Sequence, residues 1–238
     1  RIIQPFILRR TKEEVVPELP SLTEEICYCE MTESQEKLYQ KQKNIARNIL
    51  LGNTDSTNKH QTKILSSLAS LTRLRIIANH PAILENDFEG ESGKFTQIIE
   101  FAELLISEGH KILIFSSFVK HLRLIANFFN ERNWKYAWLT GETTKRHEEI
   151  ERFNNDAYVN AFFISLKAGG VGLNLTAADY VFILDPWWNP FAEKQAVSRA
   201  HRIGQNKKVT LYRFITLGTV EEKINILQNK KWELAESV

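Results

Sequence analysis

Short apolar segments alternate with helical stretches from about residue 92 to residue 215, and this alternation limits the possible folds more than any other feature. We expect strands over 112–115, 135–139, 161–166, 181–185 and 210–215. We expect helices between them, over 95–107, 120–131, 148–154 and 192–201. Strands separated by helices of this length favour a parallel sheet with helices on both faces. The sequence therefore predicts an α/β fold whose ligands meet the loops at the carboxyl ends of the strands.

The first 91 residues lack this alternation. Residues 1–31 are expected to be mostly extended, and Thr32-Glu-Ser-Gln35 resembles a capping box that opens a helix. A second helix is expected over 63–78, after the polar turn at 52–58. Both helices are indicated by apolar residues at helical spacing: Leu38, Ile45 and Ile49 in the first, then Ile64, Leu68, Leu71 and Ile76 in the second.

A last helix is expected to begin at Thr219-Val-Glu-Glu222, which also resembles a capping box. Val220, Ile224 and Leu227 would lie on one side of it. We therefore expect three parts: a leading segment with a helical protrusion over 1–91, an α/β lobe over 92–218, and a terminal helix over 219–238.

Composition excludes several classes of protein. The net charge is +2, so nucleic-acid binding must be argued from local clusters. Cys27 and Cys29 are the two cysteines; a Cys-x-Cys pair without other ligands is a poor zinc site, and we expect both thiols to be reduced in an intracellular protein. No signal peptide and no apolar run near the length of a membrane span occur. Because the chain starts with Arg1 and not Met, we expect a longer parent protein.

Gln195, Arg199 and Arg202 follow the strand expected at 181–185. Their spacings of four and three residues would place them along one face of a helix. Two arginines at this spacing usually belong to a solvated face with weak ion pairs. At the carboxyl edge of a parallel sheet, however, they are placed to reach the phosphates of a nucleotide that another part holds. A guanidinium there stabilises the charge that develops on the γ-phosphoryl oxygens, and its planar fork suits this better than lysine.

The segment Lys167-Ala-Gly-Gly-Val-Gly-Leu173 follows the strand at 161–166. Its glycines are typical of a tight turn that needs positive φ. Glycines also allow backbone N–H groups to approach a phosphate closely. Both interpretations fit the sequence.

These segments resemble the motifs of the Swi/Snf-type ATPases in helicase superfamily two. Residues 195–205 resemble motif VI, 167–179 motif V, 185–190 the block between them, and 111–118 motif IV. Residues 139–154 resemble the next block, in the shorter form usual for bacterial members, and 73–81 and 5–11 match further landmarks. The resemblance covers nearly the whole chain in the right order.

This resemblance implies the second RecA-like motor lobe, with the family's helical protrusion and a C-terminal brace helix. Arg199 and Arg202 would act as arginine fingers, with Gln195 setting their geometry. Gly170, Gly172 and Asp185 would couple to the nucleotide. The implied contacts to the DNA backbone are Ser116, Ser117, Thr140, Gly141, Arg146, Ser165, Lys167 and Trp188.

No G-x-x-x-x-G-K-[ST] sequence and no acidic strand end suited to Mg²⁺ occur. The resemblance places ATP and Mg²⁺ mainly on a preceding RecA-like lobe of the same protein, and we expect no metal ligands in this chain. The complete protein would be an ATP-dependent translocase on double-stranded DNA, in the cytoplasm, or at the nucleoid if bacterial. The isolated chain is expected to be monomeric and inactive.

Two other functions remain open. A nucleic-acid-binding module without ATPase chemistry fits the missing nucleotide loop but leaves Gln195, Arg199 and Arg202 unexplained. A strand-separating helicase of a sister family shares motifs IV to VI. The helical insertion at 31–81 and the block at 185–190 argue against it.

Overall fold

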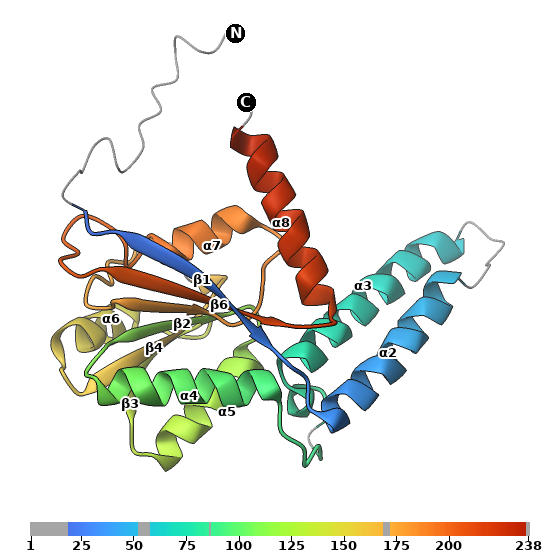
Figure 1. The fold of residues 1–238 in the computed structure, drawn as a ribbon, viewed down its shortest axis with the longest axis horizontal. Helices are drawn as coiled ribbons and strands as arrows, with labels where there is room; N and C mark the ends of the chain where they lie inside the picture. Colours follow the sequence, from blue (N-terminus) through green and yellow to red (C-terminus); the bar gives the residue numbers. More distant parts are fainter. Residues whose placement is uncertain (1–18, 52–57, 86, 169–171, 237–238) are drawn as a thin grey trace, which may run out of the picture.

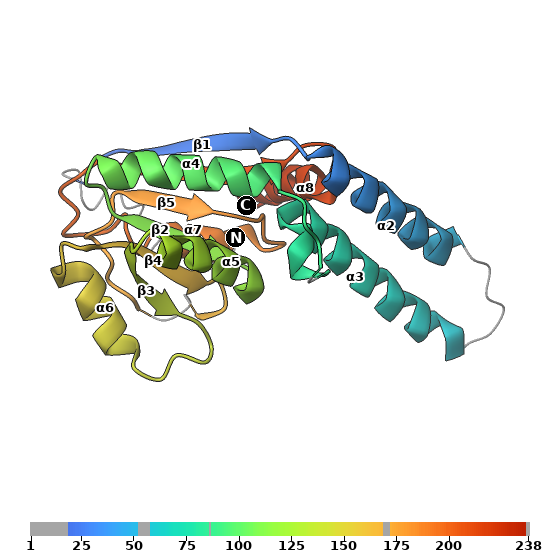
Figure 2. The same ribbon diagram turned by 90° about the horizontal axis from the view of Figure 1, so that it is seen from below.

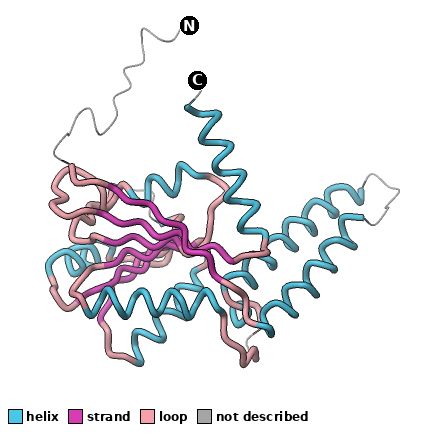
Figure 3. The backbone as a smooth tube through the Cα atoms, in the orientation of Figure 1, coloured by secondary structure: helices cyan, strands magenta, loops and turns pink. Residues whose placement is uncertain are grey.

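The computed structural model describes residues 19–51, 58–85, 87–168 and 172–236. Within these ranges one parallel sheet of six strands forms the centre of the molecule, in the order β1-β6-β5-β2-β4-β3 (Figures 1 and 3). The strands are β1 (Leu22–Cys29), β2 (Ile112–Ser116), β3 (Lys135–Leu139), β4 (Val159–Ser165), β5 (Tyr180–Ile183) and β6 (Val209–Thr216). The parallel α/β sheet expected from the sequence is confirmed.

The inner strands are apolar because helices cover both faces of the sheet. On one face, Ile114 and Phe163 pack with α4 (Gly93–Ser107) and α5 (Val119–Glu131). On the other face, Phe115 and Phe162 pack with α6 (Arg146–Asn155) and α7 (Pro190–Val197). We call the sheet and these four helices the lobe.

Strand β1 joins the sheet at its edge. It pairs with β6 from Leu22 opposite Val209 to Cys29 opposite Thr216. Cys27 and Cys29 point inward, as their alternation predicts, and burial raises the pKa of Cys27 to about 11 and that of Cys29 to about 12. Both thiols therefore stay protonated and unreactive near neutral pH. Strand β1 thus belongs to the same sheet as the strands after residue 92. The predicted division into parts at 1–91, 92–218 and 219–238 stays a prediction.

The helices α2 (Glu33–Leu51) and α3 (Asn58–Asn79) form a hairpin that extends away from the sheet (Figures 1 and 2). Both predicted helices are present, but of the apolar residues that indicated them Ile45, Ile64 and Leu68 are exposed. The buried face of α2 consists of Gln35, Tyr39, Gln42 and Ala46. The spacing of apolar residues does not identify the buried side of α2, because that side is partly polar. Hydrogen bonds at the base of the hairpin determine which side is buried.

At that base, side chains satisfy the last carbonyl groups of α3, which have no partner within the helix. Gln35 Nε2 donates to Ile77 O at 2.8 Å, and Thr216 Oγ1 donates to Ala78 O at 2.8 Å. Ser92 Oγ donates to the carbonyl oxygen that ends the helix, at 2.7 Å. The predicted capping box of α2 is therefore half formed: Thr32 Oγ1 accepts from the Gln35 N–H at 3.3 Å, while the Gln35 side chain turns to α3.

A short 3-10 helix, η2 (Pro81–Ile83), follows α3, and α8 (Val220–Glu236) ends the described chain. Ile224 is buried as expected, but Leu227 is exposed and Gln228 takes its place. The Gln228 side chain donates to the buried carboxylate of Glu193 on α7 at 2.6 Å. A polar contact thus joins α8 to α7. None of the described helices is both long and apolar enough to cross a bilayer.

Candidate functional site

Asp185, directly after β5, connects three segments at the carboxyl edge of the sheet. Its carboxylate is fully buried and accepts hydrogen bonds from Ser116 Oγ at 2.5 Å and from the Ser117 N–H at 3.0 Å. Arg75 of α3 donates to the other carboxylate oxygen at 3.1 Å. Because these donors occupy the carboxylate, Asp185 fixes the loops after β2 and β5 to each other. A direct contact between Asp185 and a nucleotide stays a prediction, and the geometry favours an indirect role.

The two serines at the end of β2, Ser116 within the strand and Ser117 just after it, differ in what they offer to a ligand. Ser116 is buried, and its hydroxyl also accepts from the Phe118 N–H at 3.0 Å. Ser117 is partly exposed. Of this predicted pair, Ser117 is the one whose side chain is accessible to a phosphate from outside, while Ser116 holds the turn.

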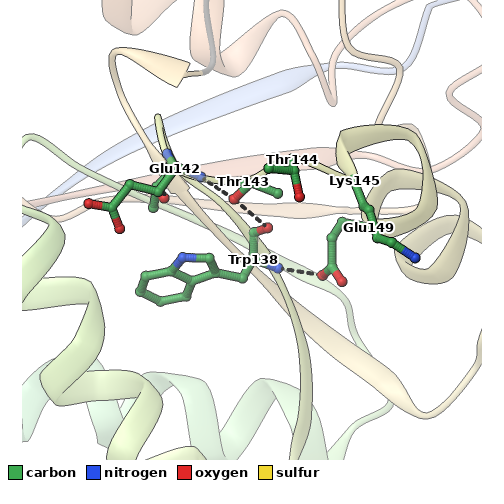
Figure 4. Close-up of a pocket in the computed structure, with 7 residues that line it drawn as sticks. Trp138, Glu142, Thr143, Thr144, Lys145 and Glu149 are labelled. Carbon is green, nitrogen blue, oxygen red and sulfur yellow. Dashed lines mark hydrogen bonds between the residues drawn. The ribbon is translucent and has the colours of Figure 1, made fainter.

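The loop after β3 borders a pocket of about 290 Å³, which Figure 4 shows in close-up. Thr140 is buried in its wall, and its N–H donates to Thr143 Oγ1 at 3.0 Å. Gly141 and Arg146 are exposed. The pocket is also lined by Glu142 and Glu149, whose negative charges disfavour a phosphate inside it. The exposed Gly141 and Arg146 are therefore better placed than the pocket for the predicted contact to the DNA backbone.

The end of β4 and the loop after it bring Ser165 and Lys167 to the same edge. Ser165 is buried, Lys167 is exposed, and the Leu166 N–H donates to Ser116 O at 3.0 Å. Gly172 has φ +28 and open space around its Cα, as expected for a turn that favours glycine. Gly170 lies outside the described residues.

The segment that carries the two arginines is not helical, contrary to the prediction of a helix over 192–201. Helix α7 ends at Val197, and residues 198–205, which we call the finger segment, form turns. The Leu175 N–H donates to Arg199 O at 3.1 Å, and Gln205 Nε2 donates to Ala178 O at 2.8 Å. The Arg199 carbonyl, which a longer helix would have used, is thus paired with the loop at 173–178, and the turns after Val197 keep Gln195, Arg199 and Arg202 from sharing one regular helical face.

Arg199 and Arg202 nevertheless lie near each other. Burial, and secondly the charge of Arg202, lower the pKa of Arg199. The Nε atom of Arg199 is buried without a hydrogen-bond partner among the described residues. Arg202 is exposed, and its hydrogen bond to Leu173 O is long, at 3.5 Å. Within the described ranges, neither arginine forms an ion pair with a carboxylate, so both guanidinium groups can accept an anion from outside the chain.

Three further residues lie on α7, within the finger segment and on the loop before α7. Gln195 is exposed on the last turn of α7. His201 Nε2 lies 2.8 Å from Pro20 O and so ties the finger segment to the chain before β1. Trp188 is 41% exposed on the loop between β5 and α7, where its carbonyl accepts from Lys231 of α8. Its ring is thus accessible, as a contact to DNA requires.

Sequence reasoning missed Arg75, which reaches the site from the hairpin. It lies within the landmark segment 73–81, but an arginine in a helix is normally exposed. Its role becomes visible only when the topology brings α3 against the loops after β2 and β5. The sequence hint of its burial was the position of this charged residue between the apolar Leu74 and Ile76. The sequence alone does not show which residue would pair with it.

A parallel six-stranded sheet with helices on both faces, and with polar and basic residues at its carboxyl edge, has the architecture of a RecA-like lobe. Comparison with known proteins gives the family. Residues 93–204 match the Helicase conserved C-terminal domain, and residues 1–83 match the SNF2-related domain. The C-terminal domain of the Sulfolobus solfataricus SWI2/SNF2 ATPase is 33% identical with a TM-score of 0.71, over 89% of this chain and 86% of that one. The chain belongs to the Swi/Snf-type ATPases of helicase superfamily two and has the fold of their C-terminal lobe.

Longer proteins of the same family are also similar to this chain. The chromatin structure-remodeling complex subunit snf21 of Schizosaccharomyces pombe is 36% identical over 98% of this chain and 20% of its own length. An uncharacterized ATP-dependent helicase of Mycoplasma pneumoniae is 36% identical over 97% of this chain and 22% of its own length. The chain thus spans about a fifth of the length of these two curated relatives. The Sulfolobus solfataricus SWI2/SNF2 ATPase core in complex with dsDNA is 37% identical over 98% of this chain and 49% of that one, with a TM-score of 0.74. A bacterial origin stays a prediction.

Proposed function

We propose that this chain is the second motor lobe of an ATP-dependent translocase on double-stranded DNA. In this role Arg199 and Arg202 stabilise the transition state of ATP hydrolysis, and Gln195 helps to set their geometry. A preceding RecA-like lobe of the same protein holds ATP and Mg²⁺. The loops at the carboxyl edge of the sheet bind DNA phosphates.

The observation that carries this proposal is the pair of guanidinium groups without a carboxylate partner among the described residues. A buried Nε atom without a hydrogen bond costs free energy, and so does the proximity of two positive charges. A triphosphate brought against the finger segment offsets the repulsion between the two charges. Hydrogen bonds that fix residues 198–205 to the loop at 173–178 keep the groups in place before the nucleotide arrives, as electrostatic preorganisation requires.

The proposed DNA contacts rest on the exposed groups of three neighbouring loops. Ser117, Gly141 and Lys167 are accessible after the strands β2, β3 and β4, which are adjacent in the sheet. Arg146 opens α6 beside them. Phosphate contacts of this kind position a protein on DNA without reading its sequence. The dsDNA in the solved Sulfolobus solfataricus core supports the choice of ligand.

The isolated chain is expected to show no ATP turnover. It carries the proposed arginine fingers but no G-x-x-x-x-G-K-[ST] loop that would hold the nucleotide phosphates. Steady-state phosphate release by the purified chain, with and without DNA, measures this. Hydrolysis above background that disappears in the Arg202→Ala variant would show that the chain is a complete ATPase.

DNA binding by the isolated chain is expected to be weak and to fall linearly on a log–log plot against salt concentration. The net charge is only +2, and the proposed contacts release counterions from phosphates. Replacing Lys167 or Arg146 by Ala should each reduce the slope by about one, because one phosphate fewer is neutralised. Lys230→Ala, an exposed change on α8, is the matched control. Tight binding to one base sequence at high salt would contradict this account.

A further inference from the structure

Arg75 lies near the end of α3, and its charged group is buried at the carboxyl edge of the sheet. One of its terminal nitrogens, Nη2, donates to Ser117 Oγ at 3.2 Å, to Asp185 Oδ2 at 3.1 Å and to Pro186 O at 3.0 Å. The guanidinium carbon lies 5.0 Å from the centre of the Phe118 ring. A single side chain of the hairpin thus contacts the loop after β2 and the loop after β5.

These contacts need more than a positive charge. Lysine at position 75 would face Asp185, but its shorter side chain and compact ammonium group cannot also lie over the Phe118 ring. The Arg75 Nε atom is buried without a partner among the described residues, which makes the position of the guanidinium costly. A lysine would neutralise Asp185 equally well and has no Nε–H to leave without a partner. Neutralising Asp185 therefore does not explain why the residue is an arginine.

The hairpin that carries Arg75 is fixed firmly at its base. Gln35 on α2, Thr216 at the end of β6 and Ser92 before α4 each donate to one of the last carbonyl groups of α3. Tyr39 Oη accepts from the Val220 N–H, at the start of α8, at 2.8 Å. Because Arg75 is part of α3, any displacement of this helix moves Arg75 with it. The contact of Arg75 with Ser117 passes that movement to the loop after β2.

We propose that Arg75 is a positioning residue that couples the helical hairpin to the Ser117-Phe118 loop and thereby sets how strongly DNA stimulates ATP hydrolysis. Ser117 is the accessible serine of that loop, and its hydroxyl oxygen accepts from Arg75. The Ser117 N–H donates to Asp185, and the Ser117 hydroxyl accepts from Arg75, which itself donates to Asp185. The pair of Arg75 and Asp185 therefore holds both polar groups of Ser117. This inference rests on the proposed function as a DNA-stimulated motor.

The test is Arg75→Lys in the complete protein, because lysine keeps a charge opposite Asp185 and spares the fold the cost of an unpaired buried carboxylate. The ratio of the DNA-stimulated to the DNA-free hydrolysis rate should fall by about tenfold, since small misplacements of a contact group have effects of at least this size. The thermal midpoint should stay close to that of the parent. Arg73→Lys, the same substitution on the exposed side of α3, should keep the parent ratio. A parent-like ratio in Arg75→Lys would overturn the inference and leave Arg75 as a counter-charge for Asp185.

Phe118→Leu tests the same coupling without touching the buried ion pair, so it remains informative if Arg75→Lys does not fold. It should also lower the stimulation ratio, and the double variant should be no worse than the stronger single one, because both changes release one loop. Effects that multiply would mean that the two residues act independently, which contradicts the coupling. If DNA fails to stimulate the parent protein at all, the proposed function fails, and this outcome is distinct from a failure of Arg75.

Discussion

Replacing Arg202 by Ala in the complete protein is expected to lower the turnover number for ATP by about 10³-fold or more, the range that an arginine finger contributes to phosphoryl transfer. Arg199→Ala is expected to act in the same direction. The DNA affinity should stay nearly unchanged, because an interaction made chiefly in the transition state alters turnover more than ground-state binding. Steady-state hydrolysis at saturating DNA and ATP measures the effect.

Two further variants make this result specific. Arg202→Lys retains the charge without the planar fork and should recover only a small part of the lost rate. Lys208→Ala removes an exposed positive charge just beyond the finger segment and should hydrolyse ATP like the parent. A Lys208→Ala rate as low as that of Arg202→Ala would mean that general positive charge, and not a particular guanidinium, supports hydrolysis.

The second large effect concerns stability. Replacing Lys94 by Met is expected to lower the free energy of unfolding by about 3–5 kcal/mol, the usual cost of leaving a buried charge unpaired. Lys94 and Glu221 are both fully buried, and Lys94 Nζ donates to the Glu221 carboxylate at 2.6 Å, to Asn79 Oδ1 at 3.1 Å and to Leu184 O at 2.9 Å. The pair holds together the ends of α3 and β5 and the starts of α4 and α8. Chemical denaturation of the purified chain measures the loss.

The pH dependence of this variant has a definite sign. Burial raises the pKa of Glu221, and Lys94 opposes that rise. Without Lys94 the folded protein binds a proton at Glu221 more tightly than the unfolded chain does, so stability falls as the pH rises above the ordinary range of a glutamate. The loss in Lys94→Met should therefore be smaller in mild acid than at neutral pH. Lys37→Met breaks an exposed pair with Glu33 and should change stability by less than about 1 kcal/mol at either pH.

The five strands after residue 92 were predictable because each is a short, largely apolar segment. Strand β3 runs over Lys135–Leu139 as predicted, and β2 and β6 differ from their predicted ranges only at the ends. Such strands are buried on both faces, so their composition alone reveals them. Glycine at position 172 likewise announced a turn with positive φ.

The hairpin and the finger segment were harder to predict for a common reason. In α2, a glutamine with a partner in α3 is buried while Ile45 is exposed, and helical periodicity counts only apolar residues. Helix α7 ends at Val197, and the Arg199 carbonyl beyond it accepts a hydrogen bond from Leu175, in a loop distant in sequence. Arg75 and Lys94 are buried for the same kind of reason, since their partners come from other elements. Long-range polar pairing leaves no periodic pattern in the sequence.

Among the candidate site residues, the sequence placed the loops correctly but not the accessibility of their side chains. Ser116, Thr140 and Ser165 lie at the predicted edge but are buried. Their neighbours Ser117, Gly141 and Lys167 are the groups that a ligand can reach. Whether a side chain faces the loop or the solvent depends on hydrogen bonds such as that of Ser116 to Asp185. The functions of all these residues stay predictions.

The most direct test of the central claim is a pair of titrations, ATP turnover and DNA binding, on Arg202→Ala and Lys167→Ala in the complete protein. The claim is that the finger segment serves the nucleotide and the loop after β4 serves DNA. Arg202→Ala should bind DNA like the parent and hydrolyse almost no ATP. Lys167→Ala should bind DNA more weakly and lose mainly the stimulation of hydrolysis by DNA. If Arg202→Ala instead loses DNA affinity and hydrolyses ATP normally, the finger segment belongs to the DNA interface and the account is wrong.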